Sequence, residues 1–359
     1  MDPAALIPTP DTIPVAWGWF QFLLMLTFVL HLLLMNAMLG GGIIALITHL
    51  IKPKGSPVIC QQMAHKLTYL IAFAVNFGVA PLLFLQVIYG HFFYTSSVLM
   101  ARHWLTIIAL LILAYSSAYI YHIKYKALGE GRVRVLALVV APLLVIGFLF
   151  SNNMTLMLHP ETWQHYFNQP NGTMLNLNDV TLIPRYLHFV VASVAVGGLF
   201  IALLNHFSRH ENNSNADQRI ATGLNWFCGA TTVQLGAGVL FLFYLPDHIR
   251  QLFLGGAALP TGLLTVGIGI ALGAIVLGFL RKIWPTIIAT VSVVIIMALI
   301  RDLVRKAYLA PYFKPADLTV APQTQYDLLI LFFVLLVITG GIVIYLLRIA
   351  ATATEEAQS

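Results

Sequence analysis

Long apolar runs separated by short polar connections dominate the chain. A membrane-spanning helix needs about 20 mostly apolar residues, and nine stretches reach that length: 15–50, 66–98, 103–125, 133–157, 184–207, 221–246, 262–280, 284–306 and 326–349. Strand-like alternation and internal repeats are not evident, so the pattern predicts helices. Pro81 and Pro142 fall inside the second and fourth stretches, where a proline is expected to kink a helix.

These stretches predict an all-α polytopic membrane protein formed by one integral membrane domain, 1–359. We expect residues 15–158 to form a first four-helix bundle and residues 184–306 a second one. The stretch 326–349 is expected to add one final helix.

Composition agrees with this class of protein. Of the 359 residues, 59% are hydrophobic and 9% are charged, and the mean hydropathy is +0.87. A soluble domain carries roughly a quarter charged residues, so a soluble enzyme, a disordered tail and a nucleic-acid binder are excluded. Cys60, placed in a short polar loop, and Cys228, in an apolar run, give neither a disulfide framework nor a covalent haem-attachment motif.

Charges in the loops predict the orientation. The alternate loops that begin with 51–66 carry 12 of the 19 lysines and arginines, among them Lys52, Lys54, Arg209 and Arg348. Because cytoplasmic loops are enriched in cations, we expect the N-terminus to lie outside in a bacterial inner (cytoplasmic) membrane. One outer cluster breaks this pattern, and it consists of Arg301, Asp302, Arg305 and Lys306. The cluster could bind a partner or haem propionates, or it could simply be a solvated helix end.

Histidine is abundant where charge is scarce, with 12 in the chain. His31 lies in the middle of the first span, His188 near the outer start of the fifth, and His91 and His103 in the outer parts of the second and third. Neutral imidazole is a good ligand for haem iron between membrane helices. The alternative is a hydrogen-bonded packing role for each of them.

His188 has a distinctive neighbourhood. Arg185 precedes it by three residues and therefore shares its helix face. Small residues follow it, which leave room for either a flat macrocycle or a close helix; they are Ala192, Ser193, Ala195, Gly197 and Gly198. Met297 lies one turn before Arg301, so a thioether ligand and a guanidinium would lie at depths suited to a haem and its propionates.

Several local segments resemble subunit I of the cytochrome bd quinol oxidases. The similar segments are WGWFQFLLMLTFVLHLLL, VNFGVAPLLFLQVIYG, LFSNNMTLMLHPETW and DVTLIPRYLHFVVASVAVGGLF, which together fall within residues 15–245. The resemblance implies that His31 is a haem ligand and that His188 ligates the low-spin haem beside the quinol site.

The chain departs from that family where oxygen is reduced. The family's third-helix glutamates align with Thr106 and Ala114, its long quinol loop is reduced to 247–261, and the Gly-Arg-Gln motif is absent. None of the five glutamates lies within a predicted span. Reduction of oxygen needs protons delivered to a buried iron, usually by carboxylates.

We therefore expect a haem b-containing subunit of a respiratory complex, exchanging electrons between membrane quinol and a periplasmic c-type cytochrome. It would be a quinol:acceptor oxidoreductase subunit within a larger membrane complex. The alternatives are a true cytochrome bd-type oxidase subunit and a haem-free membrane anchor or transporter. The candidate acceptors for quinol protons are Asp302, Glu161, His159 and His248.

Overall fold

The computed structural model describes residues 2–51, 57–168, 170–208 and 215–356, apart from the side chains at 343, 344, 347, 348 and 350–356. The charged residues Lys52, Lys54 and Arg209, used above to predict orientation, lie outside this part, and so does the side chain of Arg348.

Helices form nearly all of the described chain, and eight of them are long and apolar enough to cross a membrane. They are α1 (Trp17–Ile51), α2 (Val58–Leu99), α3 (Ala101–Ile123), α4 (Arg132–Leu158), α5 (Leu182–Phe207), α6 (Ala216–Tyr244), α8 (Ala258–Phe279) and α9 (Ile283–Leu309). The predicted helical, polytopic membrane architecture is therefore confirmed. Short helix α7 (Asp247–Gln251) and a π-turn (Leu252–Gly256) connect α6 to α8.

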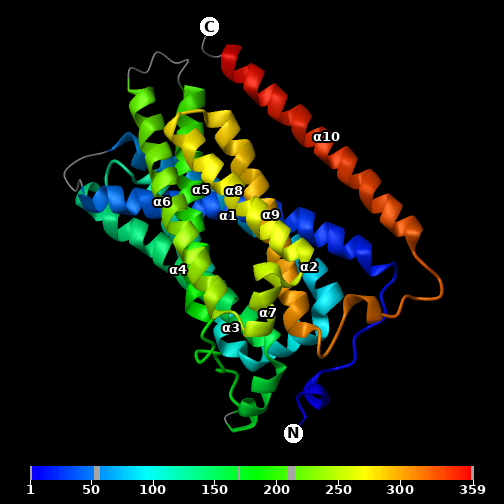
Figure 1. Ribbon diagram of the computed structural model, residues 1–359. Helices are drawn as coiled ribbons and strands as arrows, with labels where there is room; N and C mark the ends of the chain where they lie inside the picture. The colour runs from blue at the N-terminus through cyan, green and yellow to red at the C-terminus, as the bar shows by residue number, and fades with distance from the viewer. Residues whose placement is uncertain (1, 52–56, 169, 209–214, 357–359) are drawn as a thin grey trace.

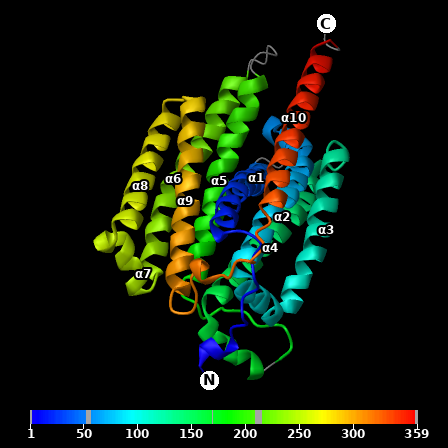
Figure 2. The same ribbon diagram turned by 90° about the vertical axis from the view of Figure 1, so that its right-hand side faces the viewer.

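The spanning helices pack as two groups of four (Figures 1 and 2). In the first group, α1, α2, α3 and α4 contact one another; in the second, α6 and α8 join α5 to α9. Helices α1 and α5 make the main contact between the groups, and α9 also reaches α1. Any site on the facing sides of α1, α5 and α9 therefore lies at the centre of the molecule.

Glycines permit this central contact. A side chain at Gly197 of α5 would overlap the backbone of Gly40 in α1, and one at Gly198 would lie 2.7 Å from the carbonyl oxygen of Gly223 in α6. Such small residues allow membrane helices to approach closely. The small residues after His188 could leave room for a flat macrocycle or for a close helix. At Gly197 and Gly198 the structure has a closely packed helix.

Two local predictions about α2 were wrong. The helix begins at Val58 and not at 66, so Cys60 is a buried helical residue and not a loop residue. The one described residue of α2 with non-helical dihedral angles is Tyr89 (φ −124°, ψ 25°), whereas the expected kink was at Pro81. A proline removes one helical hydrogen bond, yet a helix absorbs that loss when its other residues keep helical angles.

The longer connecting segments lie at one end of the bundle, which we call the lower end from its place in Figures 1 and 2. It contains the N-terminal residues and the segments 159–181 and 310–325. Ile13 pairs with Val320 as an isolated bridge, and Met174 donates its backbone N–H to Leu99 at 3.1 Å. These bonds tie the N-terminal residues to the segment 310–325, and the segment 159–181 to the end of α2.

Helix α10 (Tyr326–Glu356) stands apart from the bundle in Figure 1. Its described side chains are mostly exposed, and Phe333 meets Trp19 of α1 with ring centroids 6.1 Å apart. Its apolar part, Tyr326–Ile342, covers only part of the stretch 326–349 predicted as the final span, so within the described residues α10 is not one of the eight helices long and apolar enough to cross a membrane.

Candidate functional site: a buried histidine and arginine cluster

His188 lies on α5 where this helix meets α6. Its Nδ1 is buried and has no hydrogen-bond partner in the described structure. Opposite the ring stands Gly238 of α6, at which an added Cβ would lie 3.2 Å from His188 Cε1 and 3.4 Å from Nδ1. A buried polar atom without a partner costs free energy. The unpartnered nitrogen of His188 is therefore one that a ligand could satisfy.

Arg185 lies one helical turn before His188, as predicted. Both side chains approach Phe241 of α6, with the Arg185 guanidinium carbon 5.2 Å from the ring centroid and the imidazole centroid 6.3 Å from it. The Nε and Nη2 atoms of Arg185 are buried, and the described residues give neither a hydrogen bond. A guanidinium with free N–H groups next to a free imidazole is suited to hold an anionic group of the same ligand.

The cluster at 301–306 faces this pair from α9. Asp302 is buried, with one carboxylate oxygen 2.8 Å from Lys306 Nζ and the other 3.6 Å from Arg305 Nη1. The guanidinium of Arg301 lies 4.3 Å from the ring centroid of Phe28 in α1 and within electrostatic range of Arg185. The interpretation of the cluster as a fully solvated helix end is therefore wrong, since Asp302 and Arg305 are both buried.

His31 lies on α1, within electrostatic range of Arg301. Its Nδ1 is 2.9 Å from the carbonyl oxygen of Ala74 in α2. A carbonyl only accepts, so Nδ1 carries the proton and Nε2 keeps its lone pair. The ring lies against Gly78, where a Cβ would stand 2.8 Å from His31 Cε1. This backbone hydrogen bond is the support that metal-bound histidines commonly have, and it equally satisfies a packing role.

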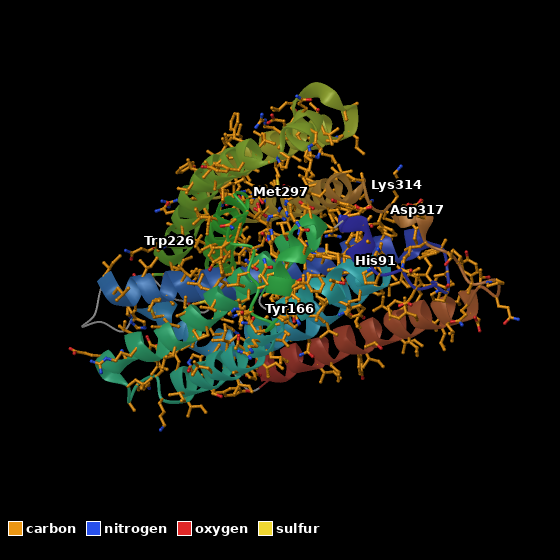
Figure 3. All side chains as sticks on the ribbon, turned by 90° about the horizontal axis from the view of Figure 1, so that it is seen from below. His91, Tyr166, Trp226, Met297, Lys314 and Asp317 are labelled. Atoms are coloured by element: carbon orange, nitrogen blue, oxygen red, sulfur yellow. The ribbon has the colours of Figure 1, made fainter. Side chains whose placement is uncertain are left out.

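Met297 belongs to the same four-helix group as His188 because α5 and α9 are neighbours. Its terminal methyl lies over Gly267 of α8, 3.4 Å from where a Cβ would be. Figure 3 shows Met297 beside α8 and α9, and His91 beside α1 and α2. His91 is buried in an aromatic cluster, 4.5 Å between ring centroids from Phe313, and its Nε2 has no described partner. It therefore lies on a different helix from His188, beside the segment that follows α9.

The remaining predicted residues lie at the periphery. His103 is half-buried at the start of α3, and His248 is exposed on α7. Glu161 is exposed and accepts a 3.4 Å hydrogen bond from the Tyr312 hydroxyl. Burial and the nearby Glu161 carboxylate raise the pKa of Tyr312 above its ordinary value. These three candidates do not join the buried cluster.

His159 does join it, through residues that the sequence patterns did not single out. Its Nδ1 lies 3.8 Å from Asp179 Oδ2, and its ring centroid is 5.1 Å from that of Tyr308. The side chain of Asp179 is 5% exposed and that of His159 18%. The only sequence signal for Asp179 is the Asp-x-Thr pattern before a helix, which is typical of a capping residue; its carboxylate does accept from the Thr181 N–H at 2.8 Å.

An open groove of about 520 Å³ lies elsewhere, between α5 and α6. It begins at Val190 and Val191 and continues towards Thr222, Asn225 and Trp226, away from the lower end. Its lining is mostly apolar, and it shares no residue with the cluster. We attach the chemistry to the buried polar residues and not to this groove.

Charge supports the same assignment. The cluster contains the four cations Arg185, Arg301, Arg305 and Lys306 and the two carboxylates Asp179 and Asp302. Among the described residues, the cluster therefore has two more cations than carboxylates, and a haem carries two propionates. Buried charges are normally paired. The orphaned His188 nitrogen and the orphaned Arg185 N–H groups therefore fit a haem.

No family model matches the chain, and neither a curated protein nor a solved structure matches it. The resemblance to cytochrome bd subunit I accordingly stays a prediction, and the site is interpreted from its own geometry.

Proposed function

We propose that this protein is a haem b-binding membrane subunit of a respiratory electron-transfer complex. It would exchange electrons between membrane quinol or quinone and a c-type cytochrome on the outer side. The observation that carries the proposal is the buried, unpartnered imidazole of His188, which faces Gly238 and lies one turn from the unpartnered guanidinium of Arg185.

Haem, when bound, supplies a one-electron redox centre. The chain's own residues would hold it: His188 through an imidazole nitrogen, and Arg185 and Arg301 by charge-assisted hydrogen bonds to carboxylates. Phe241 excludes water from both His188 and Arg185. Met297 is the candidate second ligand from α9, and His31 the candidate ligand of a second haem between α1 and α2.

The proposal includes an orientation. Fewer cations occur in the loops of the lower end, so we assign that end to the outside of a bacterial cytoplasmic membrane and make α10 the ninth span. The cationic cluster then lies near the outer surface. That position suits electron exchange with a periplasmic partner, because such a partner can come close to a site that lies near the outer membrane face.

Absorption spectra of the purified full-length protein test this function. We expect b-type bands in the reduced-minus-oxidised spectrum, and loss of the low-spin haem in His188→Ala. His206→Ala is the matched control, because His206 is on the same helix and its Nδ1 is likewise buried without a partner. An unchanged spectrum in His188→Ala would overturn the site.

Two other spectral results would favour the alternatives. A red-shifted chlorin band with oxygen consumption would indicate a cytochrome bd-type oxidase, in which a partner subunit would have to supply the acidic residues. Complete absence of Soret absorbance would indicate a haem-free anchor or transporter.

A further inference from the structure

Three separate segments converge beside Arg185 at the lower end. His159 follows α4, Asp179 precedes α5, and Tyr308 lies in the last turn of α9. His159 Nδ1 is 3.8 Å from Asp179 Oδ2, and the His159 and Tyr308 rings meet edge to face. We propose that His159 and Asp179 are the pair that accepts protons from hydroquinone. This inference rests on the proposed function and assigns the substrate-side chemistry of the same site.

Hydrogen bonding fixes the roles within the pair. His159 Nδ1 lies 2.9 Å from the Thr155 carbonyl oxygen, so it carries the proton and leaves Nε2 as the free base. Asp179 Oδ1 accepts from the Thr181 N–H, while Oδ2 has no described hydrogen-bond partner and faces His159. A carboxylate beside Nδ1 stabilises the imidazolium that forms when Nε2 takes a proton. Asp179 is thus a positioning residue for the base His159.

Two buried hydroxyl groups mark a place for the substrate oxygen. The side chains of Thr181 and Tyr308 hydrogen-bond to each other beside Arg185, and neither hydroxyl oxygen is exposed. Arg185 and Asp179 both act electrostatically on Tyr308, and so does Glu161, which places them around one another. Hydroxyl groups both donate and accept, so Tyr308 and Thr181 suit an oxygen that is O–H in hydroquinone and C=O in quinone.

Oxidation of one hydroquinone to quinone releases two electrons and two protons. In each of two equal steps one substrate O–H bond breaks and its proton passes to His159 Nε2, while the one electron released would leave through a haem held at His188 to a one-electron acceptor. The acceptor is a c-type cytochrome, or ferricyanide in an assay. Because the His159 side chain is 18% exposed, the imidazolium can release its proton to water at the lower end before the second step.

The charged and titratable groups around this base come from three directions. Asp179 lies on the segment before α5, Arg185 on α5, Tyr308 and Arg305 on α9, and Glu161 on the segment after α4. Of these, Asp179 Oδ2 is the carboxylate oxygen within 4 Å of His159 in the described structure. Removal of the Asp179 charge should therefore change the pH dependence of proton transfer more than removal of any other of these charges.

The test is stopped-flow reduction of the purified, haem-loaded full-length protein by a short-chain naphthohydroquinone. In His159→Gln we expect the rate to fall by about 10²- to 10⁴-fold, the usual contribution of a general base. Glutamine keeps a donor for the Thr155 carbonyl. In Asp179→Asn, which keeps the acceptor for the Thr181 N–H, we expect a slower rate and an acidic limb of the pH–rate profile displaced to lower pH.

Two controls make the outcomes distinct. Reduction by dithionite and the haem spectrum should stay unchanged in both variants, and the exposed His248→Gln should behave as the wild type throughout. Wild-type rates and pH profiles in His159→Gln and Asp179→Asn, with haem present, would overturn the pair while leaving the haem site intact. Absence of haem from the wild-type protein would instead overturn the proposed function and this assignment with it.

Discussion

Two glycines on the same helix offer a sharp test of the His188 site. At Gly238 an added Cβ would stand 3.2 Å from His188 Cε1, whereas at Gly236 it would meet nothing within 4 Å. Replacement of either glycine by alanine should favour the helix by about 0.5–1 kcal/mol. The two substitutions therefore differ mainly in what they do to His188.

The spacing sets the expected size of the effect. Carbon–carbon contacts are optimal at about 3.5–4.0 Å, so Gly238→Ala obliges the imidazole to move by a few tenths of an ångström. Overpacking of this kind costs typically about 1–3 kcal/mol. If this free-energy cost destabilises only the haem-bound state, it weakens haem binding by about 5- to 150-fold. Gly236→Ala should leave haem binding unchanged.

Haem content per protein, measured by the pyridine haemochrome method after purification at limiting haem, checks the prediction. Thermal unfolding of the same samples verifies that both variants are folded. Gly238→Leu and Gly236→Leu extend the comparison to a larger side chain. Equal haem content in the 238 and 236 variants would refute the placement of haem against His188 and Gly238.

Three further predictions concern the surroundings of the site. Arg185→Gln should lower the haem midpoint potential, because loss of a nearby cation favours ferric haem. The lost electrostatic interaction is about 1–2 kcal/mol at an effective dielectric of ~20, which is on the order of 40–90 mV in a redox titration. The exposed Arg102→Gln should leave the midpoint potential unchanged. His31→Ala should lower the haem-to-protein ratio from about two to one in the pigment assay, and an unchanged ratio would make His31 a packing residue. Gly197→Leu should abolish the folded monodisperse protein in size-exclusion chromatography, since its side chain would overlap Gly40, while Gly236→Leu elutes normally.

The eight long apolar helices followed from the sequence because their signal is local. An apolar run of about 20 residues has no stable place in water, and within lipid only a helix satisfies its backbone. The ends were less well predicted where packing decides them. Residues 58–65 extend α2 because Cys60, Met63 and Ala64 are buried against neighbouring helices, which no local pattern announces.

The candidate site was predicted in part. Arg185 and His188 share a helix turn, so their proximity was readable from spacing alone. The role of the small residues after His188 was left open, and the structure uses Gly197 and Gly198 for close contacts with α1 and α6. The room that the His188 imidazole occupies comes instead from Gly238, on a different helix.

Hydropathy and charge act over one helix length, so the class of this protein, its helices and the unusual charges of α9 could be predicted from the residues in order. Which polar groups meet could not be predicted in this way. His159, Asp179 and Tyr308 come from three segments widely separated in the chain. They lie together because the ends of α4 and α9 and the start of α5 meet at the lower end of the bundle. Their contact depends on how whole helices pack, and helix packing is not encoded in any short stretch of residues.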